Sequence, residues 1–207
     1  MDWAEFGQRW IRVAELTTSR YFIIAGGSFL IFYFLLKNTL FSRRMQSKFP
    51  HRKDYFRDIS FSLVTILIFA TMAALVFVVL RPYTNFFQPY DLYGKAYYFL
   101  TFPLMLLVHD AYFYAIHRLM HHPKLFRLVH RVHHFSTNPS PWTSYAFHPL
   151  EAFLEAGIIP LIAFTLPVHP SALGLFLLFQ FCYNVYGHLG FELFPKNFQK
   201  SLIGKWI

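Results

Sequence analysis

Histidine is concentrated in one short stretch of this chain. Residues 117–134 read HRLMHHPKLFRLVHRVHH, which places six imidazoles in eighteen residues. An unpaired polar ring is costly to bury, so histidine is scarce in apolar sequence unless it has a partner. Neutral imidazole is the commonest side chain among protein metal ligands. The stretch therefore indicates metal binding, and surface histidines on a basic interfacial helix are the alternative.

The spacing of these histidines predicts that they converge. His117 and His121 are four residues apart and share one face of a helix. His122 precedes Pro123, which disfavours helical geometry at residue 122 but is well suited to open a new helix. On that helix three more histidines have i, i+3, i+4 spacing and again share one face: His130, His133 and His134. Two helices that meet at a proline turn can aim five rings at a common point, with His122 beside them.

The number of convergent rings bears on the number of metal ions. A tetrahedral zinc ion takes at most four protein ligands, so five or more rings predict two ions. Imidazole suits zinc, copper, iron and nickel alike, so the ligand type alone does not choose the metal. Haem is disfavoured, because its axial ligands lie on opposite faces of the ring and are not clustered.

The elements that must position these rings are predicted to be membrane helices. Of the 207 residues, 56% are hydrophobic and 14% are charged, and several apolar runs approach the roughly 20 residues that cross a bilayer as a helix. We expect an all-α integral membrane protein with a single domain over residues 1–207. Its expected parts are spans at about 21–41, 59–80 and 96–116, a hairpin at 150–187, and a histidine-rich cap at 117–149.

Charge sets the expected orientation. The net charge is +9, but the basic residues flank apolar runs and form no stripe for nucleic acid, so we expect no nucleic-acid partner. The loop at 42–58 is rich in lysine and arginine and the loop at 81–95 is not. The positive-inside rule therefore predicts that the 42–58 loop is cytoplasmic, and that the histidine cluster lies on the same side.

Carboxylates and one further histidine are candidates to support the ligands. Asp110 lies seven residues before His117 on the same helix face. It can accept the second N–H of that ring, as carboxylates near metal-bound histidines do, or pair with a basic residue such as Arg118. Glu151, at a helix start, can orient a metal-bound ring or favour the positive helix end. His148 is expected beside the ligands or the substrate.

Four patterns in the chain resemble the fatty acid hydroxylase/sterol desaturase superfamily of integral-membrane enzymes. They are DAYFYAIHRLMH at 110–121, HRVHH at 130–134, FHPLE at 147–151 and NVYGHLGFELFP at 184–195. The resemblance covers about residues 97–207. The first family box, H-x3-H, is matched by His117 and His121. The second box, H-x2-H-H, is matched by His130, His133 and His134. A later histidine that ends a membrane helix is matched by His188, with Asn184 one turn before it.

This resemblance implies a function. It implies a non-haem centre of two iron ions, ligated almost wholly by histidine, that activates O2 against an unactivated C–H bond of a fatty acid, sterol or related lipid. Zinc can take the place of iron in a structure. The resemblance also implies electrons from a separate ferredoxin-like or cytochrome b5-like donor. The expected activity is that of an oxidoreductase, a lipid hydroxylase or desaturase at the cytoplasmic membrane face.

The resemblance has one departure. The family carries a further H-x2-H-H box after the stretch that matches 194–207, and this sequence stops at SLIGKWI without it. The matched histidines alone would leave a site for two metal ions short of ligands. We therefore expect either a fragment of a longer protein, which we favour, or a degenerate relative with impaired metal binding.

Three other classes of function remain open from the residues alone. A membrane zinc hydrolase would need a carboxylate base, and the HExxH pattern is absent. A metal transporter would place its histidines at mid-membrane, whereas these cluster at one end of a predicted span. A non-catalytic or truncated membrane protein with an incomplete metal site is the third, and the missing box favours it.

Overall fold

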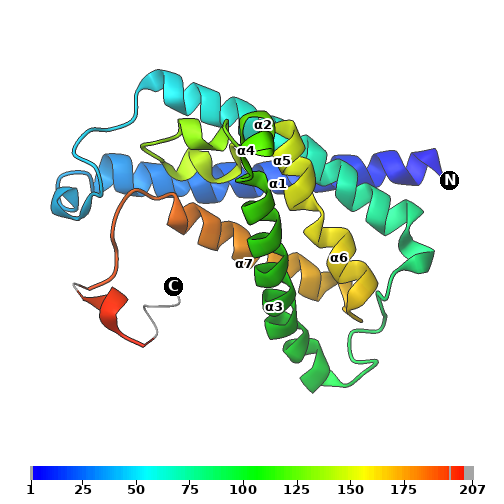
Figure 1. The fold of residues 1–207 in the computed structure, drawn as a ribbon. Coiled ribbons are helices and arrows are strands. Elements are labelled where there is room, and N and C mark those ends of the chain that lie inside the picture. Colours follow the sequence, from blue (N-terminus) through cyan, green and yellow to red (C-terminus); the bar gives the residue numbers. More distant parts are fainter. Residues whose placement is uncertain (1, 196, 203–207) are drawn as a thin grey trace.

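Helices make up the regular structure of this chain. The structure, a computed structural model, describes residues 2–195 and 197–202. Within these residues there is no strand, only two isolated β-bridges. The chain is therefore all-α, as the sequence predicts. Its α-helices (Figure 1) are α1 (Trp3–Phe29), α2 (Arg52–Ala74), α3 (Lys95–Met120), α4 (Pro123–Val129), α5 (Pro149–Ala156), α6 (Ile158–Thr165) and α7 (Pro170–Gly187).

Three of these helices are long and apolar enough to cross a membrane. α1 continues as a π-helical segment to Leu35, and α2 continues in the same way to Val79; α3 is the third. α1 begins well before residue 21, the expected start of the first span. The carboxylate of Asp2 caps it by accepting hydrogen bonds from the backbone N–H groups of Ala4 and Glu5, at 2.9 and 3.1 Å.

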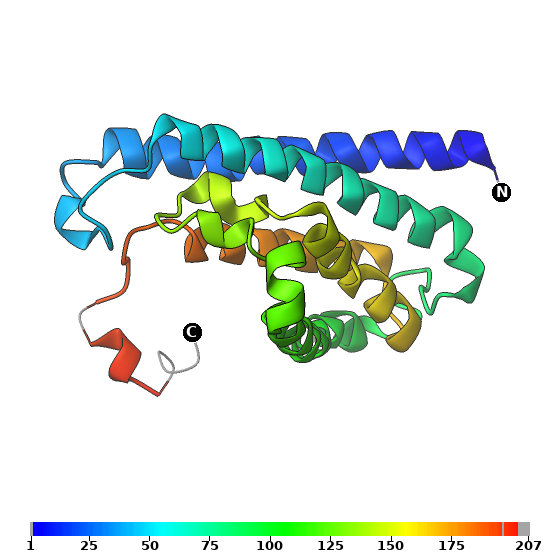
Figure 2. The ribbon, with the colours of Figure 1, turned by 45° about the horizontal axis from the view of Figure 1, so that its top comes forward.

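The long helices form a layer that α3 crosses. α1 and α2 run side by side (Figures 1 and 2). α7 runs in roughly the same direction and contacts both α1 and α3. α3 runs across these helices and not along them, so that Figure 2 views it nearly end-on. The 3-10 helix Pro141–Tyr145 packs between α2 and α7, and α4 contacts α3 and α5. Helices that are distant in the sequence therefore hold the histidine-rich segment, in which His130 is buried while His121 and His134 are exposed.

The predicted hairpin at 150–187 contains three helices. α5 and α6 are short and meet at Gly157, where an added Cβ would overlap the Tyr112 hydroxyl. That hydroxyl donates a hydrogen bond to the Leu154 carbonyl at 2.6 Å, so α3 packs directly against the bend. α7 begins at Pro170, after His169, whose ring accepts a hydrogen bond from the Ser171 N–H. Neither α5 nor α6 alone is long enough to cross a bilayer.

The core consists of apolar side chains shared between these helices. One cluster joins α3, α6 and α7 with the end of α2, and its fully buried members include Val76, Met105, Ile162 and Phe176. A second cluster joins α1, α2 and α7 around Tyr21. Large apolar side chains also remain exposed on the long helices, for example Phe34 at 75% and Phe99 at 72%. Such surfaces suit lipid and not water.

Candidate metal centre

The end of α3 brings the first two histidines together. His117 and His121 lie one helical turn apart, and their Nε2 atoms are 3.2 Å from each other. The Phe113 ring stacks on His117 from the preceding turn, with ring centroids 5.2 Å apart. This i, i+4 geometry is the one that the sequence spacing predicts.

α4 brings a third ring to the same place. His122 ends the turn after α3, and Pro123 opens α4, as predicted. α4 ends at Val129, earlier than the expected helix through residue 134, and His130 occupies its C-cap. The ligand nitrogens of His117, His121 and His130 all lie within 4.8 Å of one another. The position of His130 at the C-cap of α4, and not on a helix face, directs its ring toward His117 and His121.

The second histidine box reaches the cluster through a turn and a short 3-10 helix, His133–Phe135. The His134 ring centroid lies 5.0 Å from that of His121 and 4.7 Å from that of His130. His133 faces the other way, toward His188 at the end of α7, with their Nε2 atoms 3.4 Å apart. The rings therefore form two adjoining groups, linked by the stacked pair of His130 and His133 at 5.6 Å.

Glu151 holds one of these rings. The His130 Nδ1 atom lies 2.7 Å from Glu151 Oε1, and both side chains are 1% exposed. When Nδ1 carries the proton and donates it to the carboxylate, Nε2 keeps its lone pair for a ligand. The Nε2 atom is buried without a hydrogen-bond partner in the described part of the chain. A buried polar atom of this kind calls for a partner, and a metal ion supplies one.

α7 holds His188 in a comparable way. The Nδ1 atom of His188 donates to the backbone carbonyl of Asn184 at 2.8 Å, which leaves Nε2 directed at His133. The side chain of Asn184 points elsewhere and donates to the Ser144 carbonyl at 2.9 Å. The His133 ring is hydrogen-bonded to the backbone of Ala146, and its Nε2 is directed at His188. Asn184 thus acts on the cluster through its backbone and on the loop at 136–145 through its amide.

Burial lowers the pKa of four of the clustered histidines. It lowers the pKa of His133 to about 3, and the neighbouring His188 and His130 add to this because like charges repel. Burial also lowers the pKa of His130, His134 and His188. Neutral imidazole is the form that binds a metal ion, so the site is prepared for a cation at neutral pH. The same burial raises the pKa of Glu151 to about 8 while no cation is bound, whereas a metal ion on His130 Nε2 would favour the charged carboxylate that accepts from Nδ1.

Three of the predicted supporting residues lie at the margin of the cluster. The Asp110 side chain is 77% exposed, and its carboxylate lies 3.3 Å from Nδ1 of His109. Among the described residues it makes no ion pair or hydrogen bond with His117. His122 caps α4, where its ring accepts a hydrogen bond from the Lys124 N–H at 3.4 Å. His148 caps α5 in the same way. The capping roles of His122 and His148 explain their positions before the prolines that begin α4 and α5.

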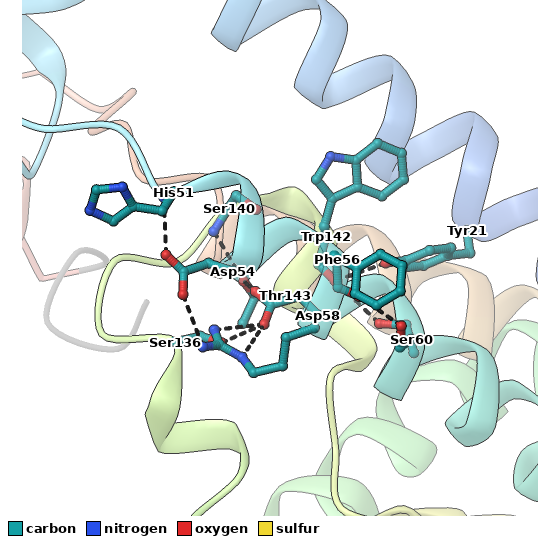
Figure 3. Close-up of polar contacts among 12 residues, drawn as sticks. Tyr21, His51, Asp54, Phe56, Asp58, Ser60, Ser136, Ser140, Trp142 and Thr143 are labelled. Carbon is teal, nitrogen blue, oxygen red and sulfur yellow. Dashed lines mark hydrogen bonds and ion pairs between the residues drawn. The ribbon is translucent and has the colours of Figure 1, made fainter.

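A buried carboxylate that the sequence reasoning missed fixes the loop after the second histidine box. Asp58 of α2 is 2% exposed and accepts hydrogen bonds from Ser136 Oγ at 2.8 Å and Thr143 Oγ1 at 2.6 Å. Arg57 donates to the same carboxylate through Nε and Nη2 and reaches Asp54 through Nη1. Figure 3 shows Asp58 between α2 and the loop at 136–145. The sequence shows Arg57 and Asp58 only as neighbouring opposite charges. It gives no sign that Asp58 binds the loop, because Ser136 and Thr143 lie far along the chain.

More side chains from the long helices bind the same loop. The hydroxyl of Tyr21 donates to the Trp142 carbonyl at 2.8 Å, and Ser62 Oγ donates to the same atom at 3.2 Å. The Tyr33 hydroxyl lies 3.0 Å from the Leu189 carbonyl, next to His188. α1 and α2 therefore position the segment that joins His134 to α5 and its Glu151.

A cavity of about 510 Å³ lies against the histidine cluster. His117, His130, His133 and His188 line one part of it. Aromatic side chains from α2, α3, α7 and the loop line much of the rest: Phe69, Phe113, Tyr145, Phe147 and Phe181. A volume of this size is typical of small-molecule sites, and its mostly apolar wall suits an apolar ligand. The arrangement can hold a lipid beside a metal ion.

Comparison with known proteins identifies the family of this chain. The family model named fatty acid hydroxylase matches residues 102–206, which is half of the chain, and this range holds all of the clustered histidines. The chain belongs to the fatty acid hydroxylase family, as the resemblance in the sequence predicts.

Particular relatives are sterol desaturases and oxidases. The chain is 36% identical over 89 residues to the probable Delta(7)-sterol 5(6)-desaturase of Neurospora crassa, covering 42% of this chain and 26% of that protein. It is 33% identical over 96 residues to the lathosterol oxidase of Rattus norvegicus, covering 46% of this chain and 32% of that protein. The chain thus spans about a quarter to a third of the length of these relatives. No solved structure matches it.

Proposed function

We propose that this chain is part of an O2-dependent lipid hydroxylase or desaturase whose histidines hold two iron ions. The observation that carries the proposal is the convergence of six imidazoles in two adjoining groups beside an apolar cavity. The ligands proposed are His117, His121, His130, His133, His134 and His188. Membership of a family of lipid hydroxylases and desaturases supports an oxidoreductase activity.

The donor set fits iron. The rings converge, burial lowers the pKa of four of them, and the buried Nε2 of His130 has no hydrogen-bond partner within the described residues. Imidazole binds iron and zinc alike, so zinc is expected to occupy the same site when iron is scarce. Iron supplies the chemistry that the side chains lack, which is the activation of O2 against an unactivated C–H bond.

The protein's own side chains orient the ligands and exclude water. Glu151 keeps the proton of His130 on Nδ1, and the Asn184 carbonyl does the same for His188, so that each Nε2 presents its lone pair. The aromatic wall of Phe113, Tyr145 and Phe147 keeps the cavity apolar. An apolar enclosure separates a reactive oxidant from bulk water and admits a lipid from the bilayer.

The surroundings of the site support a membrane location and an external electron donor. Three helices can cross a membrane by length and composition. The segment at 117–149 is proposed as a cap on the cytoplasmic side, because the basic 42–58 loop favours that side. Basic residues around the cluster suit an acidic ferredoxin-like or cytochrome b5-like donor: Arg118, Lys124, Arg127 and Arg131.

Metal analysis of the purified full-length chain tests this proposal. We expect about two iron ions per chain, and loss of at least half of the iron in His133→Ala. His122→Ala is the matched control, because that ring caps α4 outside the cluster, and its iron content should equal that of the wild type. A well-folded wild-type chain that takes up no iron or zinc would refute the proposal.

A further inference from the structure

Arg20 of α1 places a positive charge in the wall of the cavity. It lines the cavity together with Thr17, one turn earlier on α1, and Gln180 of α7. The Arg20 side chain is half-buried. A guanidinium is charged at every physiological pH and presents five N–H donors, so it is costly to keep beside apolar groups without an acceptor.

No carboxylate in the described residues pairs with this guanidinium. Three acidic side chains line the cavity, namely Asp110, Glu151 and Glu155. Asp110 contacts His109, and Glu151 contacts His130. Burial and the charge of Glu151 raise the pKa of Glu155, with no contribution from an arginine. The electrostatic neighbour of Arg20 is the hydroxyl of Tyr145, which is not an anion at neutral pH.

An aromatic wall connects Arg20 to the histidines. Tyr21, next to Arg20, stacks on Tyr145 with ring centroids 6.1 Å apart. The Tyr145 ring lies 6.5 Å from Phe147, whose ring lies 5.3 Å from His133. The cavity therefore has a cationic, hydrogen-bonding part and a metal-ligating part, and the wall between them is apolar.

We propose that Arg20, with Thr17 and Gln180, binds the oxygen-bearing head group of the lipid substrate. The shared chemistry is a hydrogen-bond acceptor oxygen, either the carboxylate of a fatty acid or the hydroxyl of a sterol. The apolar body of the lipid lies along Tyr145 and Phe147. This inference rests on the proposed function and adds to it that the oxidised carbon is remote from the head group.

Lipid binding to the purified full-length chain in detergent tests the inference. The probes are two fluorescent lipids, cis-parinaric acid with a carboxylate and dehydroergosterol with a hydroxyl. Arg20→Gln removes the charge, and Gln180→Leu removes a neutral hydrogen-bonding group from the same site. The matched control is Arg12→Gln, because Arg12 is exposed on the same helix and does not line the cavity.

We expect Arg20→Gln to weaken binding of at least one probe by about tenfold or more, because the probe loses a hydrogen bond to a charged group. Gln180→Leu should weaken binding of the same probe by about threefold or more. If Arg20→Gln does not fold, Gln180→Leu tests the head-group site in its place. Arg12→Gln should bind within twofold of the wild type. The probe that is affected identifies the head group as carboxylate or hydroxyl.

Two results would overturn the inference. One is a folded Arg20→Gln variant, or Gln180→Leu in its place, that binds both probes as tightly as the wild type; the other is a wild-type chain that binds neither probe. The iron content of the same preparations separates this inference from the proposed function. Iron retained with unchanged lipid binding contradicts the head-group site alone, whereas iron absent with binding lost in Arg20→Gln contradicts the metal centre alone.

Discussion

Asp58→Asn is expected to loosen the loop at 136–145 and, through it, the second histidine box. The carboxylate of Asp58 accepts hydrogen bonds from Ser136, Thr143 and the guanidinium of Arg57 while it is 2% exposed. An amide keeps one acceptor oxygen, but its NH2 group faces donors and cannot replace the second. Ser136 follows His134 by two residues, so its release is transmitted directly to the ligands.

The size of the effect follows from the contacts. Loss of one partner from a buried ion pair costs roughly 3–5 kcal/mol. Arg57 keeps its contact with Asp54 and is 25% exposed, which reduces the loss. We therefore expect about 3 kcal/mol, which corresponds to an apparent melting temperature lowered by roughly 6–12 °C. Iron content should fall at the same time, because His133 and His134 lose their anchored neighbour.

The assay is thermal unfolding in detergent, with iron measured on the same samples. Asp54→Asn is the matched control: it removes the other carboxylate that contacts Arg57, but that side chain is 32% exposed. An exposed pair contributes up to about 1 kcal/mol, so the control should be much milder. The reasoning is refuted if Asp58→Asn melts within a degree of the wild type, or if Asp54→Asn is equally damaging.

Three further predictions concern positions around the cluster. Glu151→Gln should lower iron affinity by about 10- to 100-fold, measured by competition with a chelator, because the carboxylate no longer orients His130; unchanged affinity would contradict that role. Gly157→Ala should destabilise the chain by about 1–3 kcal/mol in thermal unfolding, because its Cβ overlaps the Tyr112 hydroxyl. Adding Tyr112→Phe should recover part of that loss, and full additivity of the two changes would argue against the overlap. Tyr33→Phe should lower the free energy of unfolding by about 1–2 kcal/mol in thermal unfolding, because the buried Leu189 carbonyl loses its donor. Its iron content should equal that of the wild type, because the loop keeps its other contacts.

The sequence by itself determined the local part of the site. The four-residue spacing of His117 and His121 places both rings on one face wherever a helix forms, and the helix from Lys95 to Met120 does form. Pro123 started a helix as predicted. The helix through His134 did not form, since α4 ends at Val129. Periodicity fixes relations within one helix and says little about where the helix ends.

Tertiary structure alone decided which distant groups meet. Glu151 contacts His130 across 21 residues, His188 faces His133 across 55, and Thr143 reaches Asp58 across 85. The cavity likewise joins Arg20 to the histidines only because α1, α2 and α7 pack around the loop at 136–145. Such contacts depend on how helix faces pack in three dimensions. The hydrophobic pattern of each segment specifies that it has a buried face, but not which partner covers it.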